Sequence, residues 1–438
     1  MKKIGLVLLI ILFVLLNSSF VAIVASSVMW SKTYGGSGMN ISTDLVQTSD
    51  RGYVLIGLTY SNTDGDSDAL LIKTNEYGEM LWNKTFGGPD NYSASSLIQT
   101  NDGDLVFVGT NASFNEGYIP IGTMPEGAWS FIWLVKTDQN GNIEWSQTFE
   151  FESGYYYGSS LVQTIDGGLA LSGHFFYENQ EDANIILIKT DSLGNIEWTK
   201  SYGGPGGESD PSSLLQTSDG GFALVCKRFP IGEVFVDAWF LKTDEYGTMQ
   251  WNQTFGGARM DYMTSLIELS DQEFVLAGCT DSYGYGGYDF WLLKTDNFGN
   301  LEWEKTYGTP NMDTNPDLIQ TLDGNFALAG YTHYDSFADL LLIKTDNQGN
   351  MKWNQTYTGK AVLGRPSLVQ TFDGGYALSG SKGSFESEDW DFWLIKTDEN
   401  GIIPENNLTL FGFLSLGIIL LVVKLAYKKR EKVFCKEP

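Results

Sequence analysis

Short apolar runs separated by turn signals recur along most of the chain. In one typical copy, a run at residues 160–164 leads into an Asp-Gly turn, a second run covers 168–173, and a third at 185–190 ends in Lys-Thr. Runs of this length, without the spacing of an amphipathic helix, predict β-strands. Their apolar positions are nearly continuous instead of alternating, which is typical of sheets covered on both faces. The chain is therefore predicted to be all-β.

A tryptophan marks the same point of each copy, where the motif W-x-x-T-[YF] begins. The intervals between successive tryptophans are 52, 63, 53, 53, 52 and 50 residues. Four short strands per period of about 50 residues are typical of β-propeller blades. We expect blades at about 36–87, 88–150, 151–203, 204–256, 257–308, 309–358, and 359–403 together with 28–35. The seven tryptophans are Trp30, Trp82, Trp145, Trp198, Trp251, Trp303 and Trp353.

The two ends of the repeat array have complementary defects. A turn motif, [DN]-x-x-G-x-x-x-W, precedes every one of these tryptophans except Trp30, and after the last copy of the turn Glu405 stands at the tryptophan position. If residues 28–35 supply the outermost strand of the last sheet, every blade is complete. Such a ring has no free sheet edge, whereas an open solenoid would have no reason to divide one unit between both termini. We therefore predict a seven-bladed β-propeller over residues 28–403, closed by its N-terminal strand.

The turn motif carries a resemblance to a known family. Asp191, Gly194 and Trp198 follow an aliphatic strand in the arrangement Asp-x-x-Gly-x-x-x-Trp, which resembles the tryptophan-docking motif of quinoprotein-type (PQQ-like) propellers. The resemblance implies that each repeat tryptophan packs against the next blade, with Trp30 serving the closing blade. This sequence departs from the family by Lys-Thr before the Asp and by the lack of a Thr before the Gly. The resemblance implies packing and no particular chemistry.

Both ends of the chain carry apolar segments. Residues 1–26 have the order of a secretory signal peptide, with an uncleaved anchor as the alternative. After a linker at 404–407, residues 408–427 are long enough to span a bilayer as a helix, with a buried soluble helix as the alternative. The basic tail at 428–438 favours a cytoplasmic C-terminus. We therefore expect a single-pass protein of the cell membrane with its propeller outside. Pro404-Glu405 before the apolar span is similar to sorting signals of microbial surface proteins.

The exported part is strongly acidic. Without the two N-terminal lysines and the six basic and two acidic residues of 424–438, it holds 19 basic and 52 acidic residues, a net charge near −33. A surface of this sign repels phosphate, which argues against nucleic acid as a partner.

Export also bears on cysteines and glycosylation. Cys226 and Cys279 fall in equivalent strands of consecutive repeats, and because stacked sheets lie about 10 Å apart we expect no disulfide between them. Sequons for N-glycosylation occur at Asn40, Asn83, Asn91, Asn111, Asn252, Asn354 and Asn407.

The strand order decides which connections share a face. With the strands of each blade named A to D, the A–B and C–D turns lie on one face, here called the turn face, and the B–C and D–A loops on the other, the loop face. The turn face repeats tight Asp-Gly and Asp-x-x-Gly turns, which we interpret as structural. The loop face varies, and the second blade carries an insertion there at about 111–128. Variable loops with aromatic anchors are typical of binding sites, so we predict ligand contacts at Phe114, Tyr118, Trp129, Tyr285 and Trp390.

A ring of acids is expected on the loop face. An Asp occurs five residues before the Lys of most Lys-Thr pairs, and one B–C loop also alternates acids. Oxygen ligands of this kind suit Ca²⁺, but an Asp that hydrogen-bonds backbone at the start of a strand is the alternative. No cofactor is required, and calcium is the one metal that we consider. The candidate ligands are Asp64, Asp66, Asp68, Asp237, Asp289, Asp339 and Asp391.

The residue types that the sequence contains favour a binding function over a catalytic one. The chain has only two histidines, His174 and His333, three blades apart, so neither a histidine-rich metal site nor a Ser-His-Asp triad is easily assembled. The adjacent cysteines that the quinoprotein resemblance would imply near a cofactor are also absent from the sequence. We therefore expect a non-catalytic surface protein that recognises a protein, a glycan or a surface-layer partner. The alternative is an exported propeller enzyme, either a quinoprotein-like dehydrogenase or a carboxylate-based hydrolase or lyase.

Overall fold

The structure is a computed structural model. It describes residues 29–61, 67–113, 128–151, 154–177, 183–203, 208–228, 235–334, 337–359, 364–384 and 389–403. The predicted signal peptide 1–26, linker 404–407, membrane span 408–427 and tail 428–438 lie outside these residues. Over the described ranges, no helix is long and apolar enough to cross a membrane. One compact unit covers Met1–Gly401, and a second covers Ile402–Pro438, of which only residues 402 and 403 are described.

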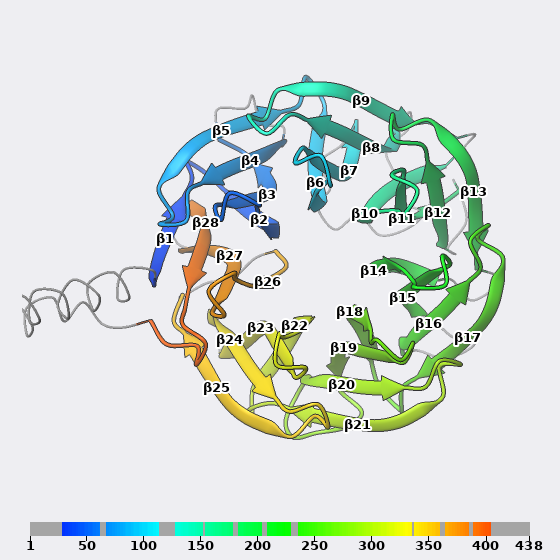
Figure 1. Ribbon diagram of the computed structural model, residues 1–438, viewed down its shortest axis with the longest axis vertical. Coiled ribbons are helices and arrows are strands. Elements are labelled where there is room, and N and C mark those ends of the chain that lie inside the picture. The colour runs from blue at the N-terminus through cyan, green and yellow to red at the C-terminus, as the bar shows by residue number, and fades with distance from the viewer. Residues whose placement is uncertain are drawn as a thin grey trace, which may run out of the picture. The chain divides into compact units, whose positions relative to one another are not determined.

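The described part of the larger unit is all-β, with 28 strands. They form antiparallel groups of four around a central axis, consistent with a β-propeller (Figure 1). In sequence order the strands are β1 (Trp30–Tyr34), β2 (Asn40–Gln47), β3 (Tyr53–Thr59), β4 (Asp68–Thr74), β5 (Met80–Phe86), β6 (Asn91–Gln99), β7 (Leu105–Ala112), β8 (Ser130–Thr137), β9 (Ile143–Phe149), β10 (Tyr155–Gln163), β11 (Leu169–Phe176), β12 (Asn184–Thr190), β13 (Ile196–Tyr202), β14 (Glu208–Gln216), β15 (Phe222–Arg228), β16 (Asp237–Thr243), β17 (Met249–Phe255), β18 (Asp261–Glu268), β19 (Phe274–Thr280), β20 (Asp289–Thr295), β21 (Leu301–Tyr307), β22 (Met312–Gln320), β23 (Phe326–Tyr334), β24 (Phe337–Thr345), β25 (Met351–Tyr357), β26 (Ser367–Gln370), β27 (Tyr376–Ser384) and β28 (Asp389–Lys396).

Each group runs from an inner strand at the axis to an outer strand at the rim (Figure 1). Most groups are separate sheets, for example β2-β3-β4-β5. The groups β6 to β9 and β10 to β13 are joined by one parallel pair, Tyr155 with Ser130. The middle strands are buried on both sides, and apolar clusters pack one sheet against the next. This explains the nearly continuous apolar runs of the sequence.

The two ends of the array meet in one sheet. Strand β1 pairs antiparallel with β28, with Trp30 opposite Lys396 and Tyr34 opposite Phe392, in the order β1-β28-β27-β26. The predicted pairing of the N-terminal strand with the last Lys-Thr strand is therefore confirmed.

The repeat tryptophans pack as expected. Trp198 lies against Gly247 of the next sheet, where an added Cβ would come within 2.8 Å of the indole ring. The same contact joins Trp30 to Gly78 and Trp353 to Gly401. Each of these glycines has a positive φ, near 70°, which only glycine adopts freely. The Asp-x-x-Gly turn thus reverses the chain direction, and its glycine gives the indole ring a surface without a side chain to pack on.

The Lys-Thr and Gln-Thr motifs also have structural roles on the turn face. Lys73 is buried and pairs with Asp50 of the Asp-containing A–B turn of its own sheet, at 2.7 Å between Nζ and Oδ1. The Gln99 side chain accepts a hydrogen bond from the Ser49 backbone N–H of the neighbouring sheet, at 2.8 Å. Phe372 N donates to Gln47 Oε1 in the same way across the closure. The interpretation of these turns as structural is consistent with these contacts.

Candidate functional site

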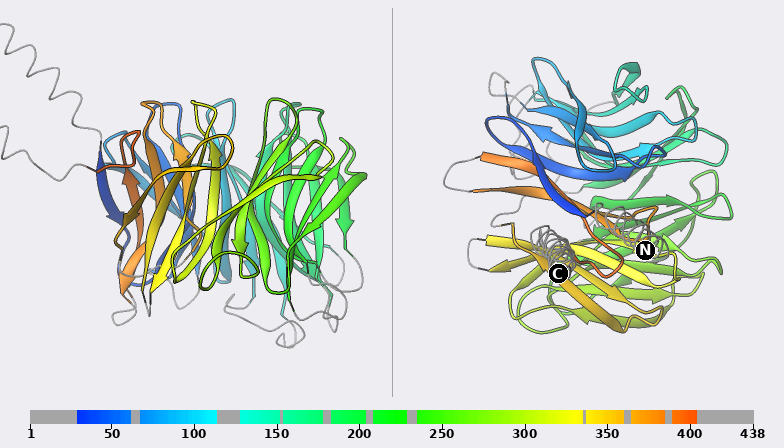
Figure 2. Two further views of the ribbon diagram at one scale, coloured as in Figure 1. Left: turned by 90° about the horizontal axis from the view of Figure 1, so that it is seen from below. Right: turned by 60° about the vertical axis from the view of Figure 1, so that its left-hand side comes forward.

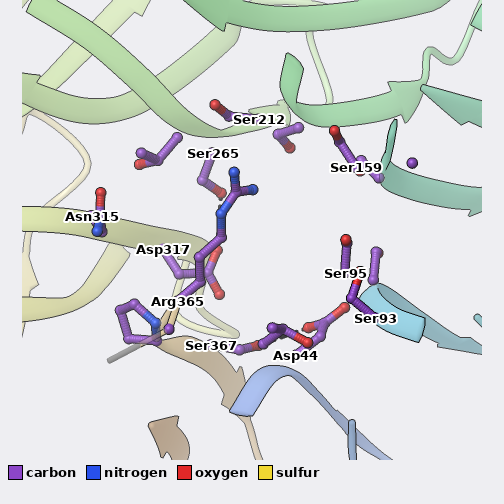
Figure 3. Close-up of a pocket in the computed structure, with 18 of the residues that line it drawn as sticks. Asp44, Ser93, Ser95, Ser159, Ser212, Ser265, Asn315, Asp317, Arg365 and Ser367 are labelled. Carbon is purple, nitrogen blue, oxygen red and sulfur yellow. Dashed lines mark hydrogen bonds between the residues drawn. The ribbon is translucent and has the colours of Figure 1, made fainter. Parts of the chain in front are cut away.

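A pocket of about 670 Å³ opens where the inner strands surround the axis (Figure 3). Most of the residues in its wall have polar side chains, and they come from many sheets. Leu58, Thr110, His174 and Lys227 line it from the ends of β3, β7, β11 and β15, where these strands lead into the B–C loops. The pocket therefore lies toward the loop face, the face that the sequence favoured for binding.

Backbone bulges put hydroxyl groups on this wall. The pairing of β6 with β7 shifts between Ala94 and Ser96, so that Ser95 is an extra residue on the inner strand. Bulges re-aim side chains and increase the local twist. Similar shifts occur in the other inner strands from β2 to β22. The pocket-lining hydroxyl residues at these points are Thr43, Ser95, Ser96, Ser159, Ser160, Ser212, Ser213, Thr264 and Ser265.

In four of the inner strands, the residue after the bulge links its sheet to the next. Asp44 Oδ2 accepts a hydrogen bond from the Leu97 backbone N–H at 2.8 Å. The Ser160 and Ser265 hydroxyl oxygens accept bonds of the same kind from the next inner strand, at 3.2 and 3.3 Å. Across the closure, Ser367 Oγ donates to Asp44 Oδ1 at 3.0 Å. Many of the pocket hydroxyls are thus already part of the fold.

Two carboxylates stand in this ring. Asp317 accepts hydrogen bonds from the Leu368 and Leu318 backbone N–H groups, at 2.8 and 2.9 Å, and from Ser265 Oγ at 3.0 Å. Burial nevertheless raises the pKa of Asp317 to about 6, and the charge of Asp44 adds to the rise. Burial also raises the pKa of Asp44, against hydrogen bonds from Leu97, Leu45, Ser367 and Ser96. Both acids hold the ring together and are harder to ionise than ordinary aspartates.

Positive groups occupy the same pocket. Arg365 reaches into it from the segment before β26, toward Ser265 (Figure 3). Lys227 lines the wall and lies 5.1 Å from the centre of the Tyr262 ring. Burial raises the pKa of Tyr262, and the charge of Arg365 opposes that rise. His174 stacks on Tyr157 at 4.8 Å between ring centres. The pocket can therefore offer hydroxyls and cationic groups to a polar ligand.

The predicted aromatic contacts that the structure describes do not line this pocket. Tyr285 is 76% exposed, and its backbone N–H donates to Asp289 at 2.5 Å. Trp129 is half-buried and stacks on Phe131 at 5.1 Å. Trp390 is only 1% exposed, which argues against a ligand contact of its side chain. Its backbone carbonyl accepts a hydrogen bond from Asn40, and it forms a β-bridge with Met39 where the ring closes. Phe114 and Tyr118 lie outside the described residues.

The predicted ring of acids lies against the glycines that follow the outer strands. Gly359 donates its backbone N–H to Asp339 Oδ1 at 2.9 Å. An added Cβ at Gly35 would come 1.7 Å from an oxygen of Asp391. The hydrogen bond of Asp339 matches the alternative interpretation, an Asp that caps backbone at the start of a strand. Asp68, Asp237 and Asp289 approach Gly87, Gly256 and Gly308 in the same way.

The predicted calcium ligands form no metal-binding cluster among the residues that the structure describes. Among the residues that the structure describes, no group of three His, Cys, Asp or Glu side chains could hold a metal ion. Burial raises the pKa of Asp289 to about 6, and Asp313 adds to the rise. Asp64 and Asp66 lie outside the described residues.

The predicted glycosylation sites differ in how far their side chains are exposed to solvent. The glycosylation candidates Asn40 and Asn91 are buried, at 0% and 5% exposed, because both begin inner strands. Neither side chain is therefore at the surface of the folded chain. Asn111 is half-buried, and Asn407 lies outside the described residues. The sequons on outer strands, Asn83, Asn252 and Asn354, are exposed.

Cysteines and histidines serve the fold in different ways. Cys226 and Cys279 are buried and unbonded to each other, as expected. His333 Nε2 hydrogen-bonds Thr314 Oγ1 at 2.8 Å, whereas His174 belongs to the pocket wall.

Sequence reasoning missed Asp44, Asp317, Lys227 and Arg365. A signal for the two acids was present: each stands where the other copies have Ser before the leucine of the S-L-x-Q-T strand. The two cations carry no such signal, because they belong to different repeats that meet only in space.

Comparisons with known proteins support the fold alone. No family model matches the sequence, and no curated protein matches it. Among solved structures, the polysaccharide lyase Uly1 aligns at 11% identity with a TM-score of 0.50, over 84% of this chain and 91% of that chain. A sialidase of Trypanosoma rangeli aligns at 9% identity with a TM-score of 0.48, over 82% of this chain and 54% of that chain. Sqt1 from Chaetomium thermophilum aligns at 12% identity with a TM-score of 0.46, over 84% of this chain and 100% of that chain.

Proposed function

We propose that this chain is an exported, membrane-anchored β-propeller of seven blades that binds a polar partner through its loop face, without catalysis. In this proposal residues 1–26 direct export, residues 408–427 span the membrane, and residues 428–438 lie in the cytoplasm. The partner is a glycan or a polar segment of a surface protein. The observation that carries the proposal is the pocket at the loop-face end of the axis, which combines hydroxyls with Arg365 and Lys227.

The chemistry of the wall supports a polyhydroxylated or anionic ligand. Cationic side chains form the stronger hydrogen bonds with oxygen acceptors, and half-buried ones form them in a less screened setting. Arg365 and Lys227 stand out because the exported chain is otherwise strongly acidic. Aromatic residues such as Tyr285 and Trp129 could extend the contact from the loops.

Binding by the full-length chain tests the proposal. The purified protein in detergent is applied to an array of glycans and cell-envelope fragments, with and without a calcium chelator. Arg365→Gln should weaken capture about tenfold or more, the loss of one charge-assisted contact. Arg51→Gln is the matched control, because Arg51 is exposed in an A–B turn of the turn face, outside the pocket. Equal capture by the two variants would remove the pocket from the proposal.

An enzyme is the second candidate, and one observation favours it. Asp317 and Asp44 line the same pocket, and their raised pKa values are those expected of proton donors. Their oxygens are, however, engaged by backbone N–H groups of three sheets, which favours the structural role. New reducing ends or unsaturated products from polysaccharides, lost in Asp317→Asn, would support catalysis instead of simple binding.

A further inference from the structure

Several of the large apolar side chains that the described residues leave exposed lie on the turn face. They stand at the tips of the tight turns, where the fold uses only the flanking Thr, Asp and Gly. Ile165, Leu322 and Phe372 occupy tips of A–B turns, and Leu193, Tyr246 and Phe298 tips of C–D turns. Their exposed fractions run from 61% to 84%. Apolar side chains exposed singly are ordinary on a protein surface, and what distinguishes these is that they recur at equivalent turns on one face.

The fold does not require apolar residues at these positions. At the tips equivalent to Ile165, other sheets have Ser49, Asn101 and Ser218. Only the backbone of the tip is used: Ile165 N donates to Gln216 at 2.7 Å, and Leu322 N donates to Gln370 at 2.7 Å. These bonds hold the turn so that its side chain projects away from the sheets. In Figure 2, left, the tight turns form one edge of the ring.

The course of the chain indicates what covers this surface. Gly401 lies in the C–D turn of the last sheet, under Trp353, and is therefore on the turn face. The predicted span begins at Leu408, seven residues later. At about 3.3–3.6 Å per residue, this stretch reaches about 25 Å at most. A bilayer entered at Leu408 thus lies within a short reach of the turn face.

The apolar tips suit the interface of such a bilayer. Tyr and Phe prefer the headgroup level of a membrane, and Leu and Ile gain by shallow burial among the acyl chains. Exposed carboxylates on the same turns, such as Glu245 and Glu399, would repel anionic headgroups. The surface therefore fits neutral lipid.

We propose that the turn face rests on the outer surface of a neutral bilayer, with the apolar turn tips in the headgroup region, so that the loop face and its pocket point away from the membrane. The inference rests on the anchoring that forms part of the proposed function. It assigns the turns a second role beyond that of a scaffold.

Site-directed spin labelling of the full chain tests this orientation. A nitroxide is attached at Leu322→Cys or Ile165→Cys, with Tyr285→Cys on the loop face as the control, all in a Cys435→Ser background. Cys226 and Cys279 are both 0% exposed and should stay unlabelled. The protein is reconstituted in phosphatidylcholine vesicles, and flotation shows whether it is anchored. Collision rates with a water-soluble nickel chelate and with oxygen are then compared.

The proposal expects nickel accessibility at positions 322 and 165 at least about threefold below that at 285, with oxygen accessibility raised, because oxygen concentrates in lipid. Equal nickel accessibility at the three positions in floated protein would overturn it while leaving the anchor intact. Low accessibility to both nickel and oxygen would overturn it in favour of a second copy of the chain covering the face. Failure to float would overturn the anchoring, and this inference with it.

Discussion

The indole ring of Trp30 lies against Gly78, a residue of the next sheet with a φ of +68°. Tyr34, four residues further along the same strand, donates its hydroxyl to the Gly78 carbonyl oxygen at 2.7 Å. The strand that closes the ring is therefore fastened to the first sheet by the same contact that joins the other sheets. The ring is therefore closed by a contact that belongs to the repeat pattern itself.

Replacing this glycine should destabilise the chain more than its backbone conformation alone requires. Gly78→Ala combines a left-handed residue with a methyl group 2.5 Å from Trp30. Gly324→Ala is the matched control, because Gly324 has a φ of +74° and no atom within 4 Å of an added Cβ. We expect a cost of about 1–2 kcal/mol for the control and about 1–3 kcal/mol more at Gly78. Urea unfolding of the two variants measures the difference, and equal midpoints would contradict the docking role.

Acid should destabilise the turn face between about pH 4 and pH 2. The Thr100 hydroxyl and the Lys136 ammonium lower the pKa of Asp102 to about 2. Because the folded pKa lies below the unfolded one, this stabilisation is present above the unfolded pKa of about 3.9 and is lost as the pH falls through 2.

A second ion pair of the turn face, between Asp166 and Lys189, allows this loss of stability in acid to be tested at a single site. Although burial opposes it, hydrogen bonds from Thr164 and Lys189 lower the pKa of Asp166 to about 2. Asp166→Asn should cost no more than about 1 kcal/mol at pH 7, since the carboxylate is largely exposed, and should reduce the acid slope of stability. Glu399→Gln, an exposed change of the same charge, should leave the slope as it is. Thermal melts at intervals from pH 7 to pH 2 provide the comparison.

Glycans should be confined to the rim of the ring. Asn83 and Asn354 are exposed on outer strands, whereas Asn40 is fully buried and hydrogen-bonded to Trp390 and Thr59. A glycan on Asn40 would break these bonds and prevent the ring from closing. Mass spectrometry of peptides from the secreted or membrane-bound protein should find modification at Asn83, Asn252 or Asn354, and none at Asn40 or Asn91. Full occupancy of Asn40 in folded protein would contradict the observed closure.

The two cysteines of the sheets should resist thiol reagents. Burial raises the pKa of the Cys279 thiol to about 12, and Cys226 is also fully buried. Since only the exposed thiolate reacts readily, a Cys435→Ser chain should take up no label at pH 8 until denaturant is added. Denaturation should then release two reactive thiols. Labelling of native protein at the rate of a free thiol would show that the sheets open.

Much of the fold could be predicted because its signals are local and repeated. The tryptophan spacing and the Asp-x-x-Gly turns depend on neighbouring residues, so each copy supports the others. The pairing of β1 with β28 followed from two complementary gaps at the ends of the array. The resemblance to tryptophan-docking propellers added the packing of each indole on the next sheet, which the contacts of Trp198 and Gly247 bear out.

For the binding site, the sequence could predict only the face of the propeller on which it lies, and not the residues that form it. Trp390 stands in a loop-like segment next to acids, and its sequence surroundings resemble those of exposed aromatics. It is nevertheless 1% exposed and forms a β-bridge with Met39 from the other end of the chain. Asn40 carries a sequon and is buried by the same closure. Exposure depends on what packs from elsewhere, and the sequence around a residue does not contain that information.

The amino-acid sequence by itself determined the number and order of strands in each repeat and which termini pair, because turn chemistry and apolar runs act over a few residues. Only the tertiary structure decided that Asp44, Asp317, Arg365 and Lys227 share one pocket. These residues come from different sheets, and their separations along the chain carry no trace of the ring that brings them together. The chemistry of the pocket depends on these residues meeting around the axis, and they meet there only when the ring of sheets is closed.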